Sequence, residues 1–147
     1  MTISPAFQSF ARQAPAHHAA WLQAVAGLGT ASALDGKTQS LVYIGILAAA
    51  RLESGLAFHV QEAKVHGAAR DEIISAVLAG LPAVDSWHQD GPATYVLAMS
   101  EPAVVAPAVT RALVAAGADV LSISESHHSL EDVYLELIDQ DEEANRR

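Results

Sequence analysis

The chain has 147 residues, of which 51% are hydrophobic, a net charge of −9 and no cysteine. The negative charge disfavours nucleic acid as a partner, and the lack of cysteine excludes disulfides, thiolate nucleophiles and cysteine-ligated metals. The longest apolar run, residues 41–50, is shorter than the roughly 20 residues that span a bilayer. The first 15 residues do not show the pattern of a secretory signal. We therefore expect a cytoplasmic protein without a membrane partner.

The first half of the chain predicts helices. Residues 4–28 read as a helix that breaks or restarts at Pro15, because proline suits a first helical turn. Residues 27–37 form a loop rich in glycine and small polar residues, and Asp35 is placed to cap the next helix. That helix, about 36–52, is apolar on nearly every side, which predicts a central helix buried all round.

The middle of the chain continues this pattern. Ser54 is placed to cap a third helix, 55–67, which Gly67 ends. Asp71 and Glu72 open a fourth helix, where acidic residues favour the helix dipole. Residues 81–92 break it, and we expect another helix over about 92–100.

The last third changes character. Residues 101–117 predict a helix, residues 118–124 alternate like a strand, and residues 129–147 predict a helix with Ser129 in a capping box. The predicted fold is therefore mainly all-α, a helical bundle with one short strand near 118–124. We expect residues 1–100 to form the main helical domain. Residues 101–147 would be an extension that joins the same unit or serves oligomerisation.

The third helix carries the most informative polar residues. On a helical wheel, His59, Glu62 and His66 fall inside the apolar arc, with Leu56 and Val60 on one side of them. Such a placement is costly unless each polar group is paired. The presence of these three polar side chains on the apolar side of the helix therefore needs an explanation.

Three interpretations stay open at this point. The three residues can be satisfied polar groups at a subunit interface or in a wet core pocket. They can form a catalytic site, with His59 as the acid–base group, Glu62 orienting it and His66 bordering the pocket. They can also supply part of a metal site, which would need ligands from elsewhere, such as His88 or His17.

The catalytic interpretation implies a pocket for a small molecule. We expect its walls to come from Leu56, Phe58 and Val60, with His88 in the turn at 87–90 closing over it. The excess of apolar residues in a short chain also predicts burial between subunits, and hence a homo-oligomer. No cofactor is expected, because the chain has no phosphate-binding glycine loop.

Residues 33–83 resemble the carboxymuconolactone decarboxylase and alkylhydroperoxidase D superfamily. The resemblance implies a helical fold and assembly into trimers or a hexamer. The motifs that carry it are Lys37-Thr38, then His59, Ala63 and Gly67 at spacings of four, then Asp71-Glu72-Ile73.

The two branches of this superfamily differ in their catalytic groups. The peroxidase branch has two cysteines and a glutamate, where this chain has Leu52, Gly55 and Ser40. Thiol peroxidase chemistry is therefore not expected. The decarboxylase branch resembles residues 38–45, but its glutamate four residues before the histidine is replaced by Gly55, and its turn after the fourth helix is altered at 84–91.

Two classes of function follow. One is a cofactor-free lyase that acts by acid–base catalysis at His59 on a small acidic or lactone metabolite, as the resemblance implies. The other is a non-catalytic helical oligomer or small-ligand-binding module. Residues 110–138 also resemble the C-terminal extension of some ABC-transporter ATPases, but no Walker A motif accompanies them, which favours a docking or oligomerisation element.

Overall fold

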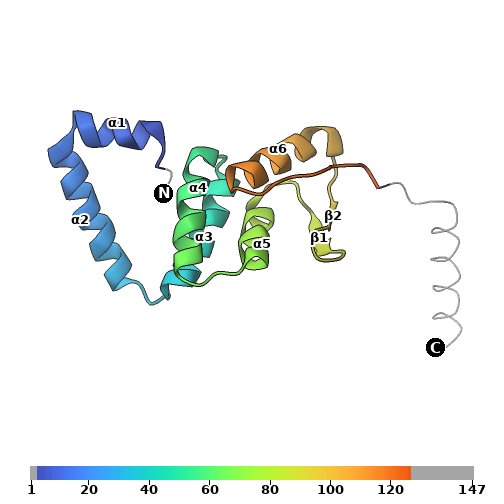
Figure 1. Ribbon diagram of the computed structural model, residues 1–147, viewed down its shortest axis with the longest axis horizontal. Helices are drawn as coiled ribbons and strands as arrows, with labels where there is room; N and C mark the ends of the chain where they lie inside the picture. The colour runs from blue at the N-terminus through green and yellow to red at the C-terminus, as the bar shows by residue number, and fades with distance from the viewer. Residues whose placement is uncertain (1–2, 127–147) are drawn as a thin grey trace, which may run out of the picture.

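The computed structural model of the protein describes residues 3–126, and it is mainly helical there, as the sequence predicts. A short antiparallel hairpin interrupts the helices between the fifth and the sixth (Figure 1). The elements in chain order are α1 (Pro5–Gln13), α2 (Pro15–Ala31), α3 (Gly36–Ala49), α4 (Glu53–Val65), α5 (Arg70–Gly80), β1 (Ser86–Gln89), β2 (Tyr95–Ala98) and α6 (Pro102–Ala115).

Helices α3 to α6 form the body of the molecule, with α3 packed against both α4 and α5. Helix α6 lies against α4 and α5 and adds Val105, Val109 and Ala112 to the same hydrophobic core. Apolar burial of this kind is the main favourable term in folding. Its most deeply buried large side chains are Ile44, Leu56, Val60, Val77 and Leu78.

Two glycines let α3 and α5 approach closely. A Cβ on Gly80 would collide with the carbonyl oxygen of Gly45, and one on Gly45 would lie 3.3 Å from the carbonyl oxygen of Ala76. The backbones of the two helices therefore touch at this crossing. Any larger residue at position 80 would force the helices apart.

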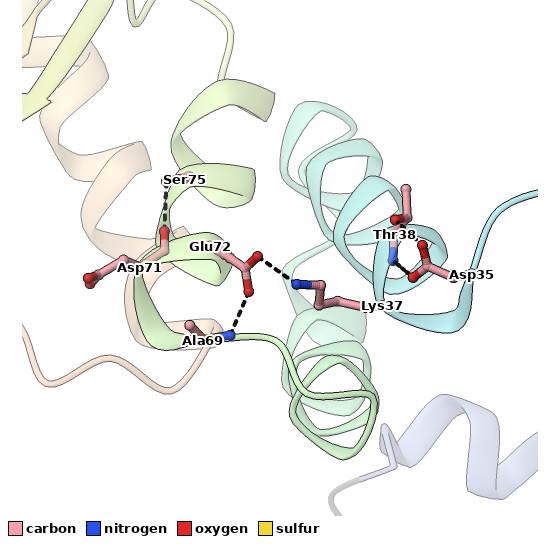
Figure 2. Close-up of polar contacts among 7 residues, drawn as sticks. All are labelled: Asp35, Lys37, Thr38, Ala69, Asp71, Glu72 and Ser75. Carbon is pink, nitrogen blue, oxygen red and sulfur yellow. Dashed lines mark hydrogen bonds and ion pairs between the residues drawn. The ribbon is translucent and has the colours of Figure 1, made fainter.

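Side chains fix the first turns of α3 and α5 (Figure 2). Asp35 caps α3, as predicted, by accepting hydrogen bonds from the backbone N–H and the hydroxyl of Thr38, at 2.9 and 2.8 Å. Glu72 accepts from the backbone N–H of Ala69 and from the Lys37 ammonium, both at 2.8 Å. Lys37 and Glu72, which belong to the family-like motifs at 37–38 and 71–73, thus join α3 to α5.

Helices α1 and α2 form an arm that stands away from the body (Figure 1). Pro15 begins α2, as predicted, but α2 continues to Ala31, so the loop predicted at 27–37 is shorter than expected and covers only residues 32–35. The two helices pack through ring contacts: Phe7 lies 5.2 Å from both His18 and Trp21, between ring centroids. Neither helix has a buried residue, so the arm lies outside the core.

The prediction that the helix over 36–52 is buried on every side is wrong. In α3 only Ser40, Ile44, Leu47 and Ala48 are buried. Val42, Tyr43 and Ile46 on its other side are 49%, 47% and 56% exposed. The helix is apolar all round, yet the body covers only half of it, because the arm does not fold back onto it.

The predicted helix over 92–100 is also wrong, since these residues form the second half of a hairpin. Strands β1 and β2 pair antiparallel, with Trp87 opposite Leu97. The turn uses Asp90 and Gly91, and Gly91 has a φ of 90° that favours glycine. Trp87, Thr94, Tyr95 and Val96 are typical strand residues, and their propensity prevails over the weak helical pattern.

The strand predicted at 118–124 is not formed in the described part of the chain. These residues are in neither strand nor helix, and Leu121 is 93% exposed. A strand needs a hydrogen-bonded neighbour, and the only described sheet, that of β1 and β2, does not include this segment. The helix predicted at 129–147 lies outside the described residues.

Two predicted helix ends are confirmed and one is wrong. Gly67 and Gly117 end α4 and α6 with φ values of 83° and 85°. Ser54, however, lies inside α4, whose N-cap is Leu52. The reason is a tight turn in which the Leu52 N–H bonds to the Leu47 carbonyl, so that α4 begins earlier. Within residues 3–126, no helix has the length and apolar character needed to cross a membrane.

Candidate functional site

His59 lies halfway along α4, on the side of the helix next to α3. Its ring centroid is 4.2 Å from that of Tyr43 on α3, with the two rings tilted by 39°. The neighbouring Phe58 ring lies 5.0 Å away at 83°, edge to face. The imidazole is therefore half-buried between two aromatic rings, where Tyr43 itself stays 47% exposed.

Burial lowers the pKa of His59 below its usual value of 6.5, because the aromatic surroundings desolvate the charged form. The negative charge of Glu62, one turn further along α4, opposes this and raises the pKa of His59, but it is the smaller effect. His59 is therefore mainly neutral at pH 7. A neutral imidazole has one N–H donor and one acceptor nitrogen, as an acid–base group requires.

Glu62 and His66 stand in different relations to His59. Glu62 is half-buried, and within residues 3–126 no hydrogen bond joins it to the His59 ring, so it acts on His59 through its charge. His66 is exposed and C-caps α4, with its Nδ1 2.9 Å from the carbonyl oxygen of Glu62. A Cβ built on Gly36 would lie 2.6 Å from the His66 ring. His66 thus packs against the start of α3.

The structure does not gather these residues into a metal site. Among residues 3–126, no three His, Asp or Glu side chains lie close enough together to hold a metal ion. The pairing of His66 Nδ1 with a backbone carbonyl occupies one of its two nitrogens. The alternative of a metal at His59, Glu62 and His66 gains no support from this geometry.

The four residues expected to line a substrate pocket are distributed differently. Leu56 and Val60 are 0% and 2% exposed and belong to the core, so they anchor α4 in the body and do not line a pocket at the surface. Phe58 does lie beside His59. His88 is an exposed residue of β1, and the hairpin lies beyond α5 from α4 (Figure 1). The structure therefore brings Phe58, but not His88, to His59.

The body has an open depression of about 360 Å³ elsewhere, at the first turn of α4 and the last turns of α6. Its mostly apolar wall does not include His59, Glu62 or His66. The lining residues are Glu53, Thr110, Arg111, Val114 and Ala115.

Tyr43 is the residue of this site that sequence analysis missed. It belongs to the apolar run 41–50, which predicts core rather than a site. Only the pairing of α3 with α4 shows that Tyr43 faces His59, and a single helical wheel carries no information about a neighbouring helix. A wheel of α3 aligned with that of α4 is the signal that would have found it.

Comparison with known proteins gives one match, to a family model. Residues 15–86 match the family model described as the carboxymuconolactone decarboxylase family. Neither the curated proteins nor the solved structures gave a match. The matched segment spans α2 to α5 and includes His59, Glu62 and Tyr43. The segment of this chain that carries His59 is therefore similar to the carboxymuconolactone decarboxylase family.

Proposed function

We propose that the protein is a cofactor-free lyase that acts on a small acidic or lactone metabolite, with His59 as its acid–base group. The observation that carries the proposal is the half-buried, mainly neutral imidazole held between Tyr43 and Phe58. Structural histidines of a core are usually enclosed and hydrogen-bonded. His59 instead lies at the edge of the body, with a partly exposed aromatic neighbour.

Decarboxylation of a lactone acid fits such a group. The bond from carbon to the carboxylate breaks, CO₂ leaves, and the electron pair passes into the conjugated lactone. The carbon that gains this electron density must then take up a proton. A neutral imidazole can donate its N–H to the lactone oxygen that becomes negative, and it can relay the proton from water.

The surroundings of His59 suit the apolar part of such a substrate. Tyr43 and Phe58 offer aromatic surface, and Ile46 adds an exposed aliphatic side chain one turn further along α3. The charge of Glu62 raises the pKa of His59 and so keeps its proton exchange closer to neutral pH. Glu62 would thus tune the base rather than orient it by a hydrogen bond.

Turnover of carboxymuconolactone tests this proposal. The wild-type protein should release CO₂, and His59→Gln should lose at least about 100-fold in kcat, the usual range for removing a general acid–base group. His88→Gln is the matched control, because this exposed histidine lies in the hairpin away from the site. Equal loss in both variants, or full activity in His59→Gln, would contradict the role of His59.

A second candidate is a non-catalytic helical oligomer or small-ligand-binding module. It is favoured by the depression at Glu53 and Arg111, which offers space for a ligand without any contact to His59. Under this alternative, wild-type protein releases no CO₂ from carboxymuconolactone. Chemical shifts of Thr110 and Val114 would then move on addition of the lactone, and those of Tyr43 would not.

A further inference from the structure

The arm and the body each leave one long apolar helix face uncovered. On α2, Trp21, Leu22, Val25 and Leu28 form the arm stripe, with exposed fractions of 45%, 46%, 43% and 73%; Phe7 of α1 covers part of Trp21, at the start of the stripe. On α3, Val42, Tyr43 and Ile46 form the α3 face, each about half exposed. Both sets recur every three or four residues, so each lies along one side of its helix.

We infer that the arm stripe of one copy of this chain packs on the α3 face of a second copy, and that this contact closes the His59 site. Every copy then gives its arm to one neighbour and receives an arm from another. Such an exchange closes in a pair or a ring of copies. It deepens the proposed function, because it supplies the missing wall of that site, but the docking itself does not depend on catalysis.

The two faces match in charge and in length. Helix α2 contains no Asp, Glu, Lys or Arg, and α3 contains none after Lys37. With 17 and 14 residues, the helices are about 25 and 21 Å long at 1.5 Å per residue. Two uncharged helices of similar length suit each other better than either suits water or a charged partner.

The connection between arm and body keeps the arm from covering its own α3. The turn at 32–35 is fixed by the Leu34 N–H, which donates to the Ser32 hydroxyl at 3.1 Å. The Gln39 amide donates to the Leu34 carbonyl at 2.7 Å, and Asp35 caps α3. This short, hydrogen-bonded turn directs α2 away from the body (Figure 1). The α3 face is therefore left for an arm that comes from another copy.

The exposed area is of the size that a stable contact needs. Stable interfaces bury about 800 Å² on each partner. In a symmetric pair, where the same two copies exchange arms, each copy contributes both its stripe and its α3 face to one interface, and these hold seven large apolar side chains with exposed fractions of 43–73%. Each has on the order of 100 Å² left to bury, as half-exposed large side chains do, so the total approaches the requirement.

The contact would complete the His59 site. Tyr43 belongs to the α3 face, and its ring covers one side of the His59 imidazole at 4.2 Å. An arm stripe placed on Tyr43 and Ile46 would exclude water from the open side of this pair. A single copy thus holds the acid–base group, and the second copy supplies the cover.

Thiol cross-linking tests the contact directly, because the chain has no cysteine of its own. A chain with Val25→Cys is mixed with a differently tagged chain with Ile46→Cys, and a short bis-maleimide is added. We expect a covalent pair of the two chains. The control mixture replaces Ile46→Cys by Val104→Cys, which is exposed on α6 outside both faces. No cross-link at position 46, or equal cross-linking at position 104, would overturn the proposal.

Light scattering and histidine modification give the second test. Leu28→Glu should reduce the assembly to a single chain, whereas Val104→Glu should leave its mass unchanged. In Leu28→Glu, diethyl pyrocarbonate should modify His59 several-fold faster, with no change at His88. A wild-type monomer, or an assembly that survives Leu28→Glu, would rule out the arm exchange. An intact exchange without CO₂ release would instead count against the lyase function alone.

Discussion

The arm and the body are both made of apolar helices, but only the body buries them. Helices α2 and α3 each contain long apolar runs, yet α3 has four buried residues and α2 has none. The difference arises from neighbours rather than composition. Helix α3 packs against both α4 and α5. Helix α2 packs against α1, and the turn at 32–35 connects it to the body. The apolar sequence of a helix thus predicts that its side chains are buried. It does not indicate whether the covering surface comes from the same chain or from a second copy.

The largest expected effect is a loss of stability that depends on protein concentration for a substitution in the arm but not for one in the body. Leu56→Ala removes a fully buried side chain of the body and should lower the free energy of unfolding by about 3 kcal/mol at any protein concentration. Leu28→Ala should lower stability only where copies associate, since Leu28 is 73% exposed in one copy. Urea unfolding at low and high protein concentration measures both. A loss for Leu28→Ala that is the same at all concentrations would contradict this comparison.

The next effect contrasts two glycines. Gly80→Ala should cost about 2 kcal/mol, because the new Cβ would meet the Gly45 carbonyl and separate α3 from α5. Gly27→Ala in α2 has no atom within 4 Å of its Cβ and lies on the side of α2 opposite the arm stripe. It should raise stability by about 0.5 kcal/mol through the better helix propensity of alanine. Thermal unfolding of both variants measures these changes in stability. Similar changes in the two variants would count against the close contact between the backbones of α3 and α5.

A smaller effect concerns the ion pair between Lys37 of α3 and Glu72 of α5. The Lys37 ammonium and the Ala69 N–H hold the pKa of the Glu72 carboxyl below its usual value. A lowered pKa means that the unfolded chain binds the proton more readily, so this contribution is present above about pH 4.5 and fades as the pH falls further. Glu72→Gln should destabilise the body slightly at pH 7, less in high salt and progressively less as the pH falls below 4.5. An equal loss at pH 3 would show that the charge plays no part.

Much of the helical framework could be predicted from the sequence because its signals are local. Asp35 caps α3, Pro15 begins α2, and Gly67 ends α4, and each effect depends on a few neighbouring residues. The hairpin at 86–98 takes the place of the helix expected over 92–100, and its sequence signal is the turn pair Asp90-Gly91. Here strand pairing between Trp87 and Leu97 outweighs a weak local pattern.

The site could be predicted only in part. His59 stands out because a histidine on the apolar arc of a helix needs a reason. Its partner Tyr43 comes from another helix, and its distance from His88 depends on the path of the hairpin. A helical wheel places His66 on the apolar arc, but it cannot show that His66 packs against Gly36 and caps α4.

The measurement that tests the central claim most directly is an NMR titration of His59, assigned by comparison with His59→Gln. The account predicts that the pKa of His59 lies below its usual value of 6.5 in the wild type, because burial disfavours the charged form. Proton uptake at His59 should then destabilise the fold as the pH falls below 6.5, and His59→Gln should weaken that dependence. In Leu28→Glu, where no arm covers the site, the pKa should move up toward 6.5. A His59 that titrates at 6.5 or above in the wild type, and alike in Leu28→Glu, would contradict both the site and its cover.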